Sequence, residues 1–126
     1  MVISFDFDDT VFYRGMIVNQ YVIDLIHVLI ERGDEIYIVS RRKLMSLYNG
    51  YTNEKVRELV YKIDPSIKVI FCNNCPKWQI LKAIDSVTHY DNAVFELETI
   101  KKNLNINLVL VMDNKQINPF HVFHTK

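Results

Sequence analysis

The chain of 126 residues is 49% hydrophobic and 12% aromatic, which provides a core for one compact domain, residues 1–126, and excludes a second. Its 15 basic and 15 acidic residues balance, which excludes a protein drawn by its overall charge to nucleic acid or to a membrane surface. No apolar run is long enough to cross a membrane, residue 2 already begins a strand, and two cysteines are too few for a disulfide scaffold, so we expect a soluble, cytoplasmic protein.

The first predicted element is an apolar strand that ends in acidic residues. Residues 2–7 have the aromatic and β-branched content of a buried strand, and Asp6 and Asp8 lie where this strand gives way to a turn. Alternate strand residues point the same way, so Asp6 and Asp8 are expected to face each other while Phe7 enters the core. Two carboxylates that close raise each other's pKa unless a cation lies between them, which favours a hard divalent metal over a purely structural turn.

The remaining elements alternate between helix and strand. Helices are predicted over residues 18–30, 53–63, 76–85 and 93–103, with Gly33 ending the first, Asn53 capping the second and Pro76 beginning the third. Strands are predicted over residues 35–40, 68–72, 87–90 and 108–112. This alternation predicts an α/β fold, a Rossmann-like three-layer α/β/α sandwich with a five-stranded parallel sheet. The tail, residues 114–126, is expected to pack back on the core.

Polar residues follow several of these strands, and parallel strands bring their carboxyl ends to one edge, where ligands bind in open α/β sheets. Lys77 is expected to join this edge from the start of a helix. Together they supply what aspartyl phosphoryl transfer requires: a nucleophilic carboxylate, a second acid for the leaving group, a hydroxyl and an ammonium for phosphate oxygens, and a further carboxylate for Mg²⁺. The strand residues are Asp6 and Asp8 from the first strand, Ser40 from the second, and Asp91 with Asn92 from the fourth.

In this ordered set the sequence resembles the haloacid dehalogenase-like (HAD) phosphohydrolase superfamily. The resemblance spans residues 2 to about 112, and its specificity lies in the order of four motifs. They are Asp6-Phe7-Asp8-Asp9-Thr10 after the first strand, Ile-Tyr-Ile-Val-Ser40 ending the second, Cys-Pro-Lys77-Trp at a helix start, and His-Tyr-Asp91-Asn92 after the fourth strand.

The resemblance implies catalytic roles for the two acids of the first motif. Asp6 would attack phosphorus and also bind Mg²⁺, and Asp8 would protonate the leaving oxygen and later activate water. The main-chain carbonyl of Asp8 and the side chain of Asp91 would complete the protein's share of the metal ligands. Asn92 stands where the family usually has a second acid, and Glu96 lies one turn further on as a substitute.

The resemblance also implies the residues that face the substrate. Ser40 and Lys77 would hold the oxygens of the transferred phosphoryl group, and Thr10 would brace the turn beneath it. The family's usual cap has no room at either insertion site, so a capless, open site is expected, which favours large substrates.

A basic run, Arg41-Arg42-Lys43, follows Ser40 directly, and Arg14 and the aromatic rings of Tyr48 and Tyr51 are expected nearby. We interpret this set as a positive rim that binds phosphate, through Arg41 in particular, and stacks a base, with a solvated loop as the alternative. The predicted substrate is therefore a phosphorylated polynucleotide end or a nucleotide. A phosphoprotein substrate is the alternative.

Three other interpretations of the sequence compete with a phosphohydrolase. A phosphoacceptor receiver domain shares the architecture, but it needs an acid after the third strand, where this chain has Cys72-Asn73-Asn74. A zinc or thioredoxin-like site at Cys72 and Cys75 lacks a second cysteine pair and follows the wrong strand. A binding protein that keeps the HAD fold without turnover is favoured only by Asn92. His89 is expected near the site but has no assigned role.

Overall fold

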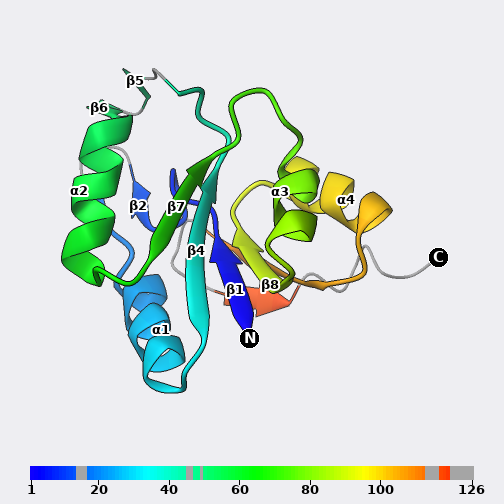
Figure 1. Cartoon of the computed structure of the whole chain (residues 1–126), viewed down its shortest axis with the longest axis horizontal. Coiled ribbons are helices and arrows are strands. Elements are labelled where there is room, and N and C mark those ends of the chain that lie inside the picture. The colour runs from blue at the N-terminus through cyan, green and yellow to red at the C-terminus, as the bar shows by residue number, and fades with distance from the viewer. Residues whose placement is uncertain (14–16, 45–46, 49, 113–116, 120–126) are drawn as a thin grey trace.

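The computed structural model describes residues 1–13, 17–44, 47–48, 50–112 and 117–119 of the chain. Five parallel strands form the sheet in the order β9-β8-β1-β4-β7, and a short antiparallel strand, β10, extends it beside β9 (Figure 1). The predicted five-stranded parallel sheet is thus confirmed. The strand bounds are β1 Val2–Phe5, β4 Glu35–Ser40, β7 Lys68–Phe71, β8 Ser86–Asp91, β9 Asn107–Val111 and β10 Ile117–Pro119.

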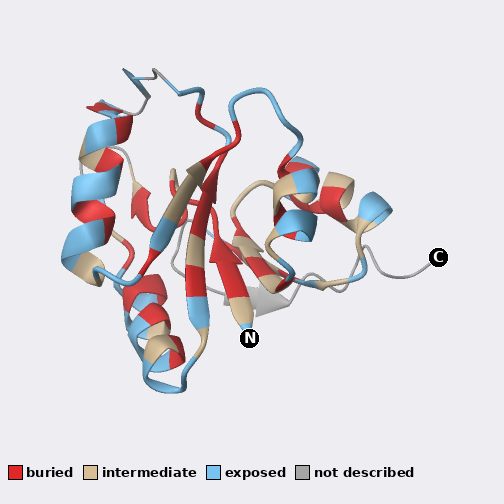
Figure 2. Ribbon diagram, viewed as in Figure 1, coloured by how far each residue is buried: buried red, intermediate tan, exposed pale blue. Residues whose placement is uncertain are grey.

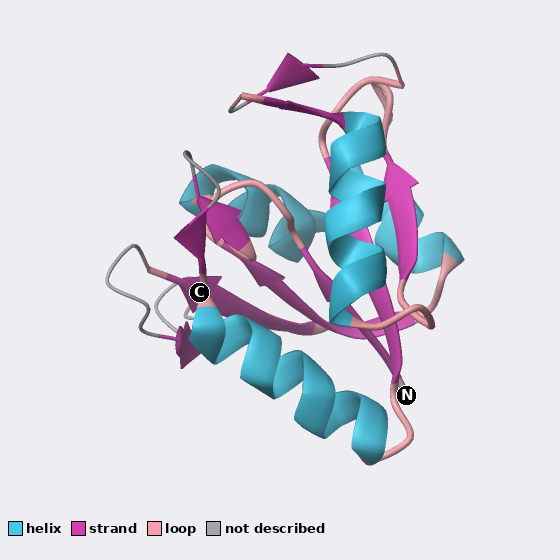
Figure 3. Ribbon diagram, turned by 90° about the vertical axis from the view of Figure 1, so that its left-hand side faces the viewer, coloured by secondary structure: helices cyan, strands magenta, loops and turns pink. Residues whose placement is uncertain are grey.

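The helices lie in two layers, one on each face of the sheet (Figures 1 and 3). Helices α1 and α2 cover one face, and α3 and α4 cover the other. This arrangement confirms the predicted Rossmann-like three-layer sandwich. No helix among the described residues is both long and apolar enough to span a membrane. The helix bounds are α1 Gln20–Glu31, α2 Asn53–Ile63, α3 Lys77–Ala83 and α4 Val94–Asn103.

The core is divided into two apolar clusters because successive strand residues point to opposite faces. On β4, Ile38 belongs to the cluster that includes Ile26 of α1 and Val56 of α2. The next residue, Val39, belongs to the cluster that includes Leu81 of α3 and Leu97 of α4. The central strands are therefore largely buried (Figure 2), and packing on both faces fixes where the carboxyl ends of β1, β4 and β8 lie.

The capping residues of two helices differ from the prediction by one position, for identifiable reasons. The cap of α2 is Thr52, whose side chain accepts a hydrogen bond from the backbone of Lys55, while the buried Asn53 donates to main-chain carbonyls instead. Pro76 caps α3 rather than beginning it, so that Lys77 is the first helical residue. Gly33 follows α1 with a φ of +97°, the left-handed conformation expected of a residue that ends a helix.

The structure adds two short hairpins that the sequence pattern did not predict. Strands β2 (Phe12–Tyr13) and β3 (Ile17–Val18) pair between β1 and α1, and strands β5 (Leu47–Tyr48) and β6 (Tyr51–Thr52) pair between β4 and α2. Strands of two residues are too short to produce a detectable alternation. The first hairpin lies after the first motif, which is one of the two positions where proteins of the HAD superfamily usually carry an inserted cap. Of the predicted tail, residues 117–119 lie against β9 as expected, and residues 114–116 and 120–126 are outside the described part.

Candidate functional site

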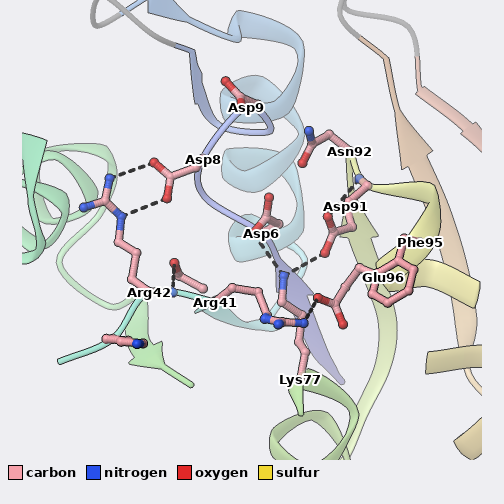
Figure 4. Close-up of a pocket in the computed structure, with 13 residues that line it drawn as sticks. Asp6, Asp8, Asp9, Arg41, Arg42, Lys77, Asp91, Asn92, Phe95 and Glu96 are labelled. Atoms are coloured by element: carbon pink, nitrogen blue, oxygen red, sulfur yellow. Dashed lines mark hydrogen bonds and ion pairs between the residues drawn. The ribbon is translucent and has the colours of Figure 1, made fainter. Parts of the chain in front are cut away.

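A pocket of about 560 Å³ opens at the carboxyl edge of the sheet (Figure 4). The ends of β1, β4 and β8 and the first residues of α3 and α4 contribute its walls. The pocket brings together the predicted catalytic, metal-binding and phosphate-binding residues except Thr10, and the predicted base-stacking residue Tyr51 does not line it. Their convergence is therefore observed, while their chemical roles stay predictions. The lining residues are Asp6, Asp8, Asp9, Ser40, Arg41, Arg42, Lys43, Lys77, Asp91, Asn92, Ala93, Phe95 and Glu96.

Lys77 joins two of the acids at the centre of this pocket. Its Nζ lies 3.0 Å from Oδ1 of Asp6 and 2.8 Å from Oδ2 of Asp91, and its side chain is 1% exposed. Burial opposes the charge of Lys77, but the two carboxylates outweigh that effect and raise its pKa above the ordinary value. As the first residue of α3, Lys77 is aimed at the strand ends by the turn at Pro76.

The two acids that share Lys77 are not equivalent. Burial and the charge of Asp91 raise the pKa of Asp6 to about 7, in spite of Lys77. Burial also acts on Asp91, but there Lys77 and hydrogen bonding from His89 prevail and hold the pKa of Asp91 below its ordinary value. One ammonium group thus does not fully compensate the charge of two buried carboxylates. Of the two, Asp6 is the less well compensated.

Asp8 has a cation of its own. Arg42 donates from Nε and Nη2 to the two oxygens of Asp8, each at 2.8 Å, and its side chain is 2% exposed. Its Nη1 donates to the carbonyl of Tyr51 at 2.7 Å, and its guanidinium lies 5.0 Å from the centre of the Tyr51 ring. Among the protein's own cationic side chains, Asp6 therefore pairs with Lys77 and Asp8 with Arg42.

The predicted positive rim is partly wrong. Arg42 and Tyr51 are each only 4% exposed, because their pairing with Asp8 and with each other turns them inward. Arg41 and Lys43 remain exposed, and Arg41 is held by Glu96 at 2.8 Å. Arg14 and the side chain of Tyr48 lie outside the described part of the structure.

Three smaller polar side chains complete the environment of Asp6 and Asp8. Thr10 donates to Oδ2 of Asp6 at 3.1 Å, so it braces the turn as predicted. In the carboxamide orientation that matches donors with acceptors, Asn92 donates to the same Oδ2 at 3.0 Å and to the carbonyl of Asp8 at 3.3 Å. Ser40 is buried, and its Oγ accepts from the backbone of Arg42 at 3.2 Å.

The donors at this site suit a hard divalent cation. Asp6 Oδ2 and the Asp8 carbonyl converge on one amide group, and Asp91 faces Asp6 across Lys77. Among the described residues no cluster of three or more acidic, histidine or cysteine side chains has the arrangement of a metal centre. Mg²⁺ does not need one, because it is usually held by one or two carboxylates with waters and substrate oxygens. Five carboxylates and four cationic side chains line the pocket, which leaves an excess of negative charge.

Glu96, the expected substitute for a second acid, has a cationic partner of its own. It is buried and its carboxylate is engaged by Arg41, so Asn92 is the residue that lies beside Asp6 and Asp8.

Two residues of the site carried no assigned function in the sequence analysis. His89 is fully buried, with Nε2 at 2.9 Å from Oδ2 of Asp91 and Nδ1 at 2.8 Å from Oγ of Ser4. His89 lies two residues before Asp91 on the same strand, so the alternation of a strand predicts that both side chains point to the same face of the sheet. Phe95 is 72% exposed on the first turn of α4, where its ring lies at the pocket beside Glu96 (Figure 4). Nothing in the local pattern distinguishes Phe95 from an ordinary surface residue.

The two cysteines do not form a reactive pair. Cys72 and Cys75 are both free thiols, and burial raises the pKa of Cys72 to about 11. A thioredoxin-like site requires a lowered thiol pKa, so the structure argues against that alternative.

Comparisons of the chain with protein-family models, with curated proteins and with solved structures found no match. The site must therefore be interpreted from its own geometry.

Proposed function

We propose that this protein is a Mg²⁺-dependent phosphomonoester hydrolase of the HAD type that acts through an aspartyl-phosphate intermediate. The observation that carries the proposal is the buried group in which Lys77 bridges Asp6 and Asp91 at the carboxyl ends of β1 and β8. Buried charges of this kind are expensive to maintain, and they concentrate at functional sites. Ser40 and a separate acid, Asp8, line the same pocket, as the chemistry requires.

In the first step, an oxygen of Asp6 attacks phosphorus and the bond from phosphorus to the leaving oxygen breaks. Asp8 supplies the proton that the leaving oxygen takes up. Asp6 is suited to the attack because hydrogen bonds from Lys77 at Oδ1 and from Thr10 and Asn92 at Oδ2 fix its carboxylate. A nucleophile held in one orientation has less entropy to lose on the way to the transition state.

In the second step, Asp8 removes a proton from water, and the oxygen of that water attacks phosphorus. The bond to Asp6 breaks, inorganic phosphate leaves, and both acids return to their starting states. Lys77, Ser40 and Arg41, which line the pocket, would hold phosphate oxygens during both steps. Mg²⁺, bound by Asp6, Asp91 and the Asp8 carbonyl, would neutralise charge that develops on the phosphoryl oxygens.

The pairing of Asp8 with Arg42 adds a requirement to this mechanism. The two-pronged guanidinium contact occupies both oxygens of Asp8, whereas the first step needs one of these oxygens to carry the proton for the leaving group. Asp8 therefore leaves Arg42 in the productive complex. A phosphate group is the natural competitor for the guanidinium, because it offers the same pair of oxygens.

For the substrate, we propose a phosphorylated nucleic-acid end or a nucleotide. The support is the exposed ring of Phe95 at the pocket and the exposed guanidinium of Arg41, both of which can stack on a base. These residues replace the inward-facing Arg42 and Tyr51 in that role. A phosphoprotein is the second candidate, since an open pocket also accepts a side chain displayed on a surface.

Release of phosphate from p-nitrophenyl phosphate, measured with and without Mg²⁺, tests the enzymatic proposal. Asp6→Asn is expected to abolish turnover because a carboxamide is not a nucleophile toward phosphorus. Asp9→Asn is the matched control: Asp9 lines the same pocket without an assigned role, and its φ of +65° suits asparagine. Activity that persists in Asp6→Asn disproves the nucleophile. Mg²⁺ binding without turnover in the parent protein identifies a binding protein instead.

The substrate proposal is tested separately with a 3'-phosphorylated oligonucleotide, free nucleotides and a phosphopeptide. The highest kcat/KM is expected for the first two. Preference for the phosphopeptide overturns the nucleic-acid proposal and leaves the phosphatase proposal intact.

A further inference from the structure

A buried chain of hydrogen bonds leads away from the pocket behind Asp91. Asp91 Oδ2 lies 2.9 Å from Nε2 of His89, and Nδ1 of His89 lies 2.8 Å from Oγ of Ser4. Ser4 in turn lies 2.8 Å from Oγ of Ser86. All four residues are at most 4% exposed, and they come from the neighbouring strands β1 and β8. Polar side chains in the middle of a sheet need a reason, because apolar residues would pack there without loss.

The partners of Asp91 determine which nitrogen of His89 carries a proton. Oδ2 of Asp91 is an acceptor that also receives a hydrogen bond from Lys77, so Nε2 must be the donor toward it. This assignment holds whether or not Nδ1 is also protonated. Because Nε2 carries the proton, Nδ1 of the neutral ring is bare and accepts from the Ser4 hydroxyl. Ser4 and Ser86 lie within hydrogen-bond distance of each other, and their hydroxyls also reach the carbonyl of Thr88, at 3.3 Å and 3.0 Å. Asp91 therefore selects the tautomer, and Ser4 holds the ring at its other nitrogen.

The remaining contact of Asp91 lies on its other oxygen. Oδ1 accepts from the backbone amide of Ala93 at 3.1 Å. His89 and Lys77 contact Oδ2, and the amide of Ala93 contacts Oδ1. Because both oxygens are held, the carboxylate is restrained from rotating about the bond between Cβ and Cγ. A carboxylate oxygen accepts more than one contact, so Oδ1 keeps acceptor capacity.

We propose that His89 is a positioning residue for Asp91: its Nε2–H fixes the rotation of the carboxylate so that Oδ1 is presented to a divalent cation, and Ser4 holds the imidazole in place at Nδ1. This inference rests on the proposed function, because it assigns Asp91 to the metal. It assigns to His89 no contact with substrate. Groups that hold a ligating carboxylate typically change metal affinity rather than the chemical step.

The test measures Mg²⁺ affinity by titration calorimetry on the full chain without substrate, and kcat at saturating Mg²⁺. His89→Leu is expected to weaken Mg²⁺ binding by about tenfold or more, with kcat at saturation retained within a few-fold. His89→Gln is expected to restore much of the affinity, because its amide can still donate toward Asp91. If His89 had a purely structural role, His89→Leu would lower the stability of the protein but would not weaken Mg²⁺ binding while kcat is retained. His89→Gln would then not restore the Mg²⁺ affinity.

Ser4→Ala and Ser86→Ala form a matched pair that also serves if His89→Leu fails to fold. Each removes one hydroxyl from the same buried chain, but only Ser4 contacts His89. Ser4→Ala is expected to weaken Mg²⁺ binding a few-fold, and Ser86→Ala is expected to leave it unchanged. Equal affinities in these two variants overturn the inference.

Nitrogen-15 NMR of the parent protein gives a readout independent of activity. The His89 resonances, identified by their loss in His89→Gln, are expected to show a proton on Nε2. A bare Nε2 overturns the inference. If the parent neither binds Mg²⁺ nor releases phosphate, the proposed function itself fails. If the parent does both and the His89 variants match it, only the positioning role fails.

Discussion

Replacing Lys77 by methionine removes the ammonium that Asp6 and Asp91 share, with little change in side-chain length. The side chains of Lys77, Asp6 and Asp91 are 1%, 10% and 1% exposed, so solvent screens their interaction little. Removal of one partner from a buried ion pair costs about 3–5 kcal/mol, because the remaining charge stays buried. The free energy of unfolding is expected to fall by about that amount at pH 7, out of a total of about 5–15 kcal/mol for a domain of ordinary stability.

The pH dependence of this loss distinguishes lost charge pairing from lost packing. Without Lys77, burial raises the pKa of both Asp6 and Asp91 above the unfolded value of 3.8. The folded variant then holds protons that the unfolded chain releases, so its stability falls as the pH rises above about 4. In the parent, the pKa of Asp91 is lowered instead. Since the pKa of Asp6 is raised in the parent as well, to about 7, the two proteins differ mainly in the proton on Asp91, and the stability difference between them grows steadily from acidic pH toward neutral pH.

Urea unfolding provides the assay, and the single tryptophan, Trp78, lies next to the substitution and reports on it. Lys82→Met, at an exposed position of the same helix, is the matched control and is expected to change stability by less than about 0.5 kcal/mol. The reasoning is refuted by a loss for Lys77→Met below about 1 kcal/mol at pH 7, or by a loss that does not diminish toward pH 4.

Three further predictions concern the pocket. Arg42→Lys cannot reproduce the two-pronged contact with Asp8, so urea unfolding is expected to show a loss of about 1.5–3 kcal/mol, and an unchanged stability contradicts that contact. Because the pKa of Asp6 is raised to about 7, protons compete with Mg²⁺ below neutral pH. Calorimetry is expected to show affinity that decreases roughly tenfold for each pH unit below that value, whereas a flat profile separates Asp6 from the metal. Phe95→Ala is expected to raise KM for a nucleotide about tenfold and to leave KM for glycerol phosphate unchanged; equal effects on both argue against stacking.

The sequence predicted the layers of the fold and the strand ends correctly because both depend on strong local patterns. The segments that end at Asp6, Ser40 and Asp91 are rich in β-branched and aromatic residues, and the helices between them have a clear period. A parallel sheet then brings these three ends to one edge whatever the details of the loops. Lys77 follows from the same argument, because a proline just before it marks the start of a helix.

The partner of each charge could not be predicted in the same way. After Ser40 the chain leaves the strand, so no period indicates which of Arg41, Arg42 and Lys43 turns inward. The answer depends on Tyr51, whose carbonyl and ring receive the Arg42 guanidinium. Tyr51 belongs to a hairpin of two-residue strands that leaves no recognisable pattern in the sequence.

The contrast between the two acids of the first motif supports the division of roles that we propose. Asp6 is held at both oxygens by donors from three separate segments: Thr10 in the following turn, Lys77 on α3 and Asn92 after β8. It cannot move without disturbing the ends of the sheet. Both oxygens of Asp8 are instead held by a single residue, Arg42, on the wall of the pocket. A nucleophile benefits from a fixed position, whereas an acid that becomes a base must change partners during the cycle. Interchanging the roles of Asp6 and Asp8 would require the opposite arrangement.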